Sequence, residues 1–270
     1  MSIVRFLVLA VVTVAFSGIA HAHEFWISPE DYTVTPDDQI VGNLRNGEEF
    51  VGSGYSYLPE RFTRFEIING DTVRPVEGRI GDKPALNMPA GDGGLAIVVH
   101  ETTTSRLTYT EWEKFVRFVE HKAMDGTLEA HAERGLPDAG FVELYSRYCK
   151  ALIAVGDGTG TDRPVGMLTE IVAEANPYTD DLSDGLPLRV LYDGAPRVGA
   201  QVELFEKAPD GEVTITLHTT DAEGRATVPA KAGHEYLADA VVMRPTENDS
   251  VEDGPVWETL WAALTFQVPE

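Results

Sequence analysis

The residues best suited to chemistry lie near the start of the chain, in the stretch His21-Ala22-His23-Glu24-Phe25-Trp26. If the chain is cut after Ala22, His23 becomes the first residue, and its free amine and imidazole Nδ1 can chelate one metal ion. An α-amine has a reference pKa of roughly 7.7 to 8.0, so a metal ion can displace its proton near neutral pH. His23 is therefore the first candidate metal ligand.

A second small-x-small motif, Gly18-Ile19-Ala20, places an alternative cut before His21. The new terminus then reads His-Ala-His, with His23 as its third residue. That arrangement suits square-planar Cu(II) or Ni(II), which bind an amine, backbone amides and an imidazole. Both cuts expose a nitrogen chelator, and the sequence leaves the choice between them open. The alternative is an exported chain that begins with an arbitrary residue and binds no metal there.

Further metal ligands must come from elsewhere in the chain. His100 follows the apolar run 95–99 at the end of an expected strand, where ligands are common and polar caps of a sheet are common too. His121 and Asp125 are four residues apart on an expected helix, so they can point into one cleft or form an exposed polar pair. The candidate metal set is therefore His23, His100, His121 and Asp125. Nitrogen ligands suit Ni(II) and Co(II), with Cu(II) as the alternative.

The other histidines and the single cysteine fit structural or surface roles. His131 lies between two glutamates and is expected on an exposed helix, whereas His218 and His234 lie near turns. Cys149 has no partner for an internal disulfide and no nearby histidine to activate it, so we expect it to be buried. The sequence contains no Gly-x-Ser-x-Gly, His-Glu-x-x-His or Cys-x-x-Cys motif. We therefore expect a protein that is not an enzyme.

The first 22 residues have the pattern of a secretory signal peptide. Arg5 precedes the apolar run Phe6–Phe16, and small residues lead to Ala20-His21-Ala22. The run is short for a membrane span, which needs about 20 apolar residues. We therefore expect a periplasmic protein whose signal is removed and which then has no membrane span.

Net charge argues against a nucleic-acid partner. The chain has 21 Lys and Arg residues against 44 Asp and Glu residues, a formal net charge of −23. Loss of the signal peptide removes one basic residue and no acidic one. Phosphate backbones and anionic membrane surfaces repel such a protein.

Short strands separated by turns predict a β-sandwich in the first part of the chain. Apolar and β-branched stretches alternate with Gly, Pro, Asn and Asp, which is typical of strands and tight turns. Asn69-Gly70-Asp71 has the composition of a hairpin turn that needs a positive φ. We expect strands within residues 25–34, 39–44, 62–68, 72–76 and 95–99.

A helical insert is expected at about residues 110–152. Thr110 and Glu113 have the spacing of a capping box, and Trp112 and Phe115 begin an apolar stripe at helical spacing. Further apolar stripes follow along the insert. We expect three helices, at about residues 111–123, 127–134 and 141–152.

A second sandwich is expected after the Asp-, Pro- and Gly-rich loop 176–185. Alternating apolar residues return from Leu186 onward, with turn signals between them, which is typical of an immunoglobulin-like or transthyretin-like sandwich. The expected fold is mainly β, with an N-terminal β-sandwich that carries a small helical insert, followed by an immunoglobulin-like or transthyretin-like β-sandwich. The expected division is a signal peptide at 1–22, the first sandwich at 23–180 and the second at 181–270.

Seven segments, in this order, resemble an exported bacterial family of unknown function (DUF 4198). The segments are HEFW, GGLAIVVHETTTSRLTYTEWEKFVRFV, YSRYCKALIAVG, IVAEANPYTD, DGAPRVGAQVELFEK, TTDAEGRATVPAKAGHEYL and ETLWAALTF. The family is often described as a periplasmic component of nickel/cobalt uptake. The resemblance implies two β-sandwiches, a mature chain that starts with a histidine, here His23, and a metal-uptake transporter in the membrane as partner.

Three functions follow as competing expectations. The first is a periplasmic metal-binding accessory to nickel or cobalt uptake, with His23 as the anchor of the site. The second is a β-sandwich module that binds an envelope partner or a glycan without catalysis. The third is a copper redox protein that uses an N-terminal histidine chelate.

Overall fold

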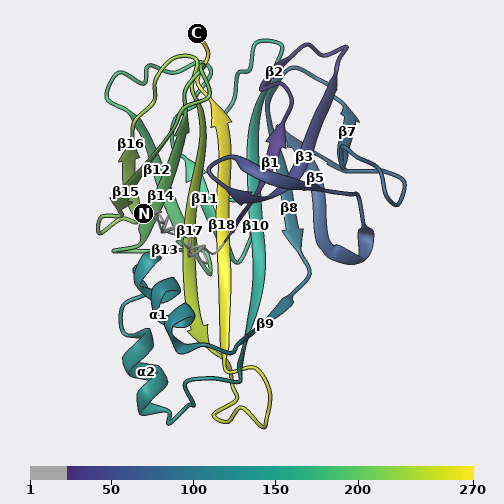
Figure 1. Cartoon of the computed structure of the whole chain (residues 1–270). Helices are drawn as coiled ribbons and strands as arrows, with labels where there is room; N and C mark the ends of the chain where they lie inside the picture. Colours follow the sequence, from purple (N-terminus) through teal and green to yellow (C-terminus); the bar gives the residue numbers. More distant parts are fainter. Residues whose placement is uncertain (1–22) are drawn as a thin grey trace, which may run out of the picture.

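A ten-stranded sheet forms the centre of the computed structural model, which describes residues 23–270 (Figure 1). The expected signal peptide lies outside these described residues. Two strands, β2 (Thr33–Val34) and β9 (Ser105–Tyr109), pair only with β10. The others follow in the order β15 (Val213–Thr219), β14 (Gln201–Lys207), β17 (Glu235–Pro245), β18 (Trp257–Gln267), β10 (Phe141–Val155), β8 (Gly94–Thr102), β5 (Phe62–Asn69) and β6 (Thr72–Pro75).

Two smaller sheets complete the β structure, each with four strands. The first contains β1 (Glu24–Pro29), β3 (Gln39–Glu48), β4 (Val51–Tyr55) and β7 (Leu86–Pro89). The second contains β11 (Thr169–Ala173), β12 (Leu186–Tyr192), β13 (Ala195–Pro196) and β16 (Arg225–Val228). The helices are the 3-10 turn η1 (Pro59–Arg61), α1 (Trp112–His121) and α2 (Thr127–Glu133). None of the helices within residues 23–270 is long and apolar enough to cross a membrane.

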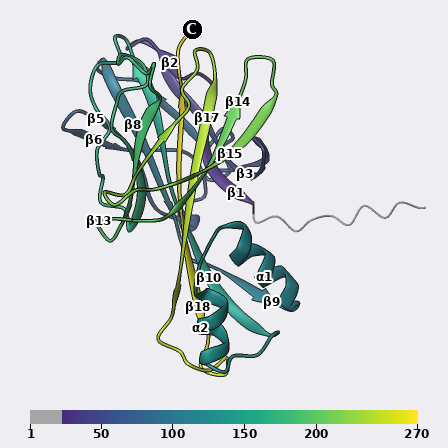
Figure 2. The same cartoon turned by 90° about the vertical axis from the view of Figure 1, so that its left-hand side faces the viewer.

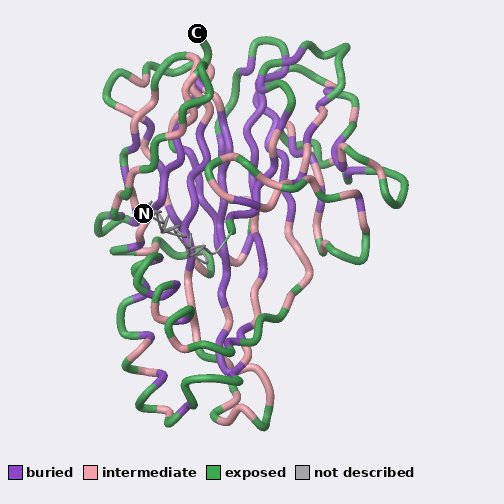
Figure 3. The backbone as a smooth tube through the Cα atoms, viewed as in Figure 1, coloured by how far each residue is buried: buried purple, intermediate pink, exposed green. Residues whose placement is uncertain are grey.

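The large sheet is buried on both faces along its middle strands (Figure 3). On one face, Ile27 of β1 shares a hydrophobic cluster with Cys149 of β10. On the other face, Leu188 of β12 shares a cluster with Leu152 of β10 and Leu264 of β18. The protein is therefore mainly β with sandwich packing on each side, as expected, and Cys149 is buried as expected.

Hydrogen bonding continues across the boundary expected near residue 180. β10 lies in the first expected sandwich, and it pairs in parallel with β18 of the second, for example Arg147 with Trp261. β11 pairs with β12 across the same boundary. The two parts of the chain therefore share sheets.

The expected strands form, and so does the hairpin between β5 and β6. Asn69 pairs with Thr72, and Gly70 between them has a φ of +54°, a conformation that glycine adopts without a steric penalty. The helix expected at 141–152 is wrong, because residues 141–155 form the strand β10. A strand buried on both faces has apolar residues without strict alternation, and here their spacing resembled a helical stripe.

The helical insert is shorter than expected and lies beyond one end of the sandwich. Figure 2 shows α1, α2 and β9 together beside the lower ends of β10 and β18. The capping box predicted at Thr110 and Glu113 is wrong, because Glu111 is the N-cap residue of α1 and no side chain caps this helix. Lys114 instead reaches Glu111 in an exposed ion pair, with 2.7 Å between Nζ and Oε1.

The insert is held to the sheet by an aromatic cluster around His131. The expectation of an exposed His131 was wrong, because this residue is only 1% exposed. The indole N–H of Trp257 donates to His131 Nδ1 at 3.0 Å, and His131 Nε2 lies 3.1 Å from the carbonyl oxygen of Pro137. Burial lowers the pKa of His131, so the neutral ring that accepts at Nδ1 and donates at Nε2 is favoured.

Replacing Trp257 with phenylalanine tests this attachment. W257F removes the donor to a buried acceptor, so we expect the free energy of unfolding to fall by about 1–3 kcal/mol beyond the loss of ring area. The half-buried Trp112 contacts the same ring of His131 and supplies the control, W112F. Urea unfolding of both variants measures the difference. Equal losses in the two variants would show that the hydrogen bond to His131 contributes nothing.

Candidate functional site

One cavity lies between β1 and α1, which both pack against the large sheet. β1 packs beside β10, where the Cys149 thiol is 3.1 Å from the carbonyl oxygen of Phe25. α1 packs on the same face, where Phe118 stacks on Trp261 at 5.5 Å between ring centroids. The space between them encloses about 430 Å³. We call it the terminal cavity, and its walls include His23, Lys114, Phe118, Tyr145, Arg147 and Trp261.

His23 lies at the rim of the terminal cavity, directly before β1. Its side chain is 58% exposed, and its Nε2 lies 3.8 Å from Oε1 of Glu48 at the end of β3. The register explains this proximity, because Glu24 pairs with Gly47 and His23 comes one residue earlier. The imidazole is therefore accessible, with a carboxylate near one of its nitrogens.

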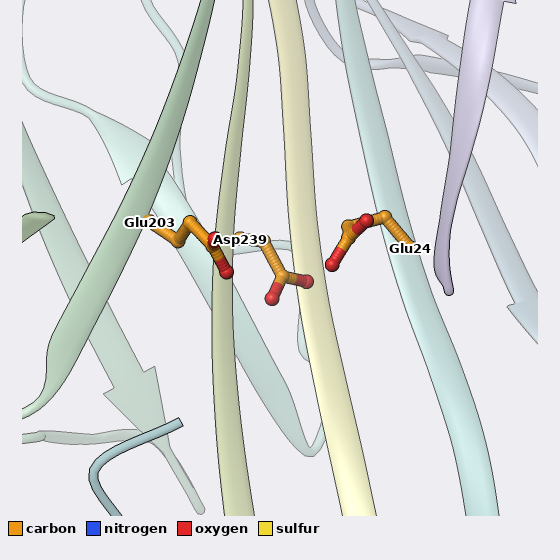
Figure 4. Close-up of side chains that lie close together, drawn as sticks. All are labelled: Glu24, Glu203 and Asp239. Atoms are coloured by element: carbon orange, nitrogen blue, oxygen red, sulfur yellow. The ribbon is translucent and has the colours of Figure 1, made fainter. Parts of the chain in front are cut away.

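Glu24, the next residue, points inward into a buried ion cluster. Lys122, which follows the last residue of α1, places its ammonium among three carboxylates. The Nζ atom lies 3.1 Å from Glu24 Oε1, 2.6 Å from Glu203 Oε2 and 2.9 Å from Asp239 Oδ2. Figure 4 shows the three carboxyl groups converging from separate strands. We call these four residues the Lys122 cluster.

Burial and charge oppose each other in the Lys122 cluster. Burial raises the pKa of Glu24 to about 7, although the Lys122 charge acts to lower it. Burial likewise raises the pKa of Asp239. Glu203 is different: burial acts to raise its pKa, but the hydrogen bond from His121 and the charge of Lys122 bring it to about 2. Burial acts to lower the pKa of Lys122, and the three carboxylates raise it above its ordinary value. Lys122 is therefore a permanent cation.

Carboxylate oxygens of Glu24, Glu203 and Asp239 lie within 4.8 Å of one another, which is a spacing that could hold a metal ion. However, the Lys122 ammonium contacts one oxygen of each residue and supplies the positive charge that they need. A metal ion would have to displace a buried lysine that has no other partner for its charge nearby. We therefore assign the cluster a structural role.

His121 and Asp125 do not form the expected pair. α1 ends at His121, and Ala123 takes a positive φ of 47°, so the chain has left the helix before Asp125. The residues are no longer one helical turn apart. His121 Nε2 instead lies 3.4 Å from Glu203 Oε1, and this hydrogen bond raises the pKa of His121. Asp125 is exposed.

His100, in β8, is buried in an aromatic cluster. The expectation of a strand-end position was wrong, because β8 continues to Thr102 and His100 is only 2% exposed. Its ring lies 4.9 Å from that of Phe65 and 5.5 Å from that of Phe25. Burial lowers the pKa of His100 to about 3, so its ring is neutral. Its Nδ1 has no hydrogen-bond partner within residues 23–270.

The four expected metal ligands therefore do not gather into one group. Among residues 23–270, no three of His23, His100, His121 and Asp125 come within coordination distance of a common point. The Lys122 cluster is not among the sites that the sequence predicts. Its members come from four segments far apart in the chain, and only the adjacency of Glu24 to His23 and of Lys122 to His121 hinted at it.

A family model described as "Domain of unknown function (DUF4198)" matches residues 20–244. No curated protein matches the sequence. Two solved structures show very low similarity. One is the tetra-tandem repeat in the extending region of a large adhesion protein, with 11% identity and a TM-score of 0.21 over 92% of this chain. The chain spans 50% of that structure's length.

The second solved structure is the D0-D1 domain of intimin, with 10% identity and a TM-score of 0.23. The match covers 90% of this chain and 97% of that one. Scores this low support no conclusion about function.

Replacing Lys122 with methionine tests the structural role of the cluster. K122M leaves three buried carboxylates without their cation, so we expect a loss of about 3–5 kcal/mol in the free energy of unfolding at pH 7. The carboxylates then have folded-state pKa values above their ordinary ones, and folding takes up protons. Stability of the variant should therefore fall as pH rises from about 4.5, and its deficit should be smaller at pH 5 than at pH 8.

The control is K114M on the exposed side of the same helix. The Lys114–Glu111 pair is about half exposed on both sides, so its loss should change stability by less than about 0.5 kcal/mol at either pH. Chemical unfolding at pH 5, 7 and 8 measures both variants. A K122M variant as stable as K114M would refute the structural role.

Proposed function

We infer that this chain, which belongs to the DUF4198 family, is an exported metal-binding protein that holds a transition-metal ion at His23 once the signal peptide is removed. The observation that carries the proposal is the position of His23. It lies at the rim of a cavity, with an exposed imidazole, at the residue that cleavage after Ala22 would make the first. A buried histidine, or one whose ring nitrogens both have partners, could not bind an incoming metal ion.

The surroundings of His23 suit a chelating histidine. A histidine that binds metal through one ring nitrogen commonly directs the other toward a carboxylate, which orients the ring. Glu48 Oε1 lies 3.8 Å from Nε2, within reach of such a contact after a small side-chain rotation. Nδ1 is the nitrogen that closes a six-membered chelate ring with the amine. The arrangement supports a site made of the amine, Nδ1 and an orienting carboxylate.

The donor set favours borderline metals over calcium or magnesium. Two nitrogens on one residue are poor ligands for ions that prefer oxygen, and good ligands for Ni(II), Co(II) and Cu(II). No cysteine lies near, since Cys149 is buried in β10. When bound, the ion would be cargo or a structural centre, and the remaining coordination positions would face the cavity or solvent.

The nickel or cobalt role and the transporter partner come from the family resemblance. A protein that captures such an ion outside the inner membrane and passes it to an uptake system needs a site that is open and exchangeable. A terminal chelate with few protein ligands has that character, in contrast to a buried site with four ligands. We therefore propose nickel or cobalt delivery as the role and copper as the competing metal.

Calorimetry on the processed protein tests the proposal. Protein that starts at His23 should bind Ni(II), Co(II) or Cu(II). H23A should weaken binding at least about tenfold, or about 1.4 kcal/mol. A Gly-Ser-Gly-Ser extension ahead of His23 keeps the imidazole and masks the amine, so it should weaken binding similarly. The matched control is H218A, which removes a half-buried histidine of the edge strand β15.

Two outcomes would overturn the proposal. One is the absence of metal binding by the processed protein, and the other is equal binding by wild type and H23A. With copper bound, hydrogen peroxide consumption is measured in parallel. Rapid consumption that H23A abolishes would favour the copper redox function over uptake of nickel or cobalt.

A further inference from the structure

We propose that Arg147 forms a binding site for a small organic carboxylate, at the junction of the terminal cavity with a second cavity. The second cavity encloses about 390 Å³ and has aromatic walls that include Phe25, Tyr55 and Phe62. We call it the aromatic cavity. Both cavities are lined by Asn46, Tyr145 and Arg147. This inference goes beyond metal binding and requires neither a metal ion nor a processed terminus.

Arg147 is a buried cation without a direct partner. It is 8% exposed, and neither Nε nor Nη1 has a hydrogen-bond partner within residues 23–270. No ion pair within residues 23–270 includes the guanidinium group of Arg147. Buried charges are normally paired because an unpaired one is costly to desolvate. A bound anion would therefore stabilise the guanidinium group of Arg147 by pairing with its charge.

Aromatic rings hold the guanidinium by its face. Its central carbon lies 3.7 Å from the ring centroid of Trp261 and 5.5 Å from that of Tyr145. Trp261 is directly opposite Arg147 in the register of β18 and β10, so the stacking follows from strand pairing. Stacking engages the face of the planar group, whereas the donors that bind carboxylates in pairs lie along its edge.

The neighbouring carboxylates are engaged with other donors. Lys122 binds Glu24 and Asp239. Glu143 accepts a hydrogen bond from the hydroxyl of Tyr109 at 2.7 Å and another from Thr259. Asp239 Oδ1 is itself without a hydrogen-bond partner, but it lies outside ion-pair distance of Arg147. Their charges partly offset that of Arg147 at a distance and leave its donors unused.

The aromatic cavity indicates the rest of the ligand. Typical small-molecule pockets enclose about 300–1,000 Å³, with apolar walls and a few polar groups that fix orientation. Here the apolar walls are Phe25, Tyr55 and Phe62, and Arg147 lies at one end. A carboxylate paired with Arg147 would place an attached ring or aliphatic chain among these side chains. The ligand class is therefore an aromatic or aliphatic monocarboxylate.

Calorimetry with metal-free, EDTA-treated protein tests the site. The probes are acetate, hexanoate, phenylacetate and indole-3-acetate, with phenylacetamide as the neutral counterpart of phenylacetate. We expect phenylacetate to bind at least about tenfold tighter than phenylacetamide, and R147Q to lose that preference. The control R61Q changes an exposed arginine at the same cavity and should alter binding less than about threefold.

The result does not depend on the stability of R147Q. Wild-type crystals soaked with 4-bromophenylacetate should show anomalous bromine density among Phe25, Tyr55 and Phe62, with the carboxylate at Arg147. The proposal is overturned if no probe carboxylate binds, if phenylacetate and its amide bind equally, or if bromine density lies elsewhere. Because these measurements exclude metal, failure here leaves metal binding by His23 to be judged by the H23A comparison alone.

Discussion

The contact between the Lys122 ammonium and three buried carboxylates joins the end of α1, the start of β1 and two paired strands of the large sheet. Lys122 follows α1, Glu24 begins the N-terminal sheet, and Glu203 and Asp239 lie on neighbouring strands of the large sheet. Removing four charged groups from water is costly, and their mutual contacts repay that cost only in one geometry. The cluster therefore sets where the helical insert and β1 stop relative to the sheet.

That placement creates the site. β1 and α1 each cover part of one face of the large sheet, and Tyr145, Arg147 and Trp261 line the cavity between them. His23 reaches the rim because Glu24, its neighbour, is anchored inside. The result is a nitrogen ligand at the opening and a buried guanidinium within. A metal ion and an organic carboxylate could thus bind at separate points of connected cavities.

Much of the fold could be predicted from the sequence, and the candidate site could be predicted only in part. The strands of the first sandwich and of the chain after Leu186 were predicted, because alternation of apolar residues reports one-sided burial. The apolar spacing of β10 predicts a helix, because the strand is buried on both faces and strict alternation is lost. His131 and His100 were placed wrongly, since their burial depends on Trp257 and Phe65, which are distant in sequence.

The sequence by itself determined the β-rich architecture, the acidic character and the candidate role of His23, because these depend on local composition, periodicity and the position of a cleavage pattern. Only the tertiary structure decided that Lys122 neutralises three carboxylates and that Arg147 has no partner. Both are consequences of burial and of distances between segments up to 117 residues apart. Whether a charge is paired is a property of its surroundings, and the type of residue does not reveal it.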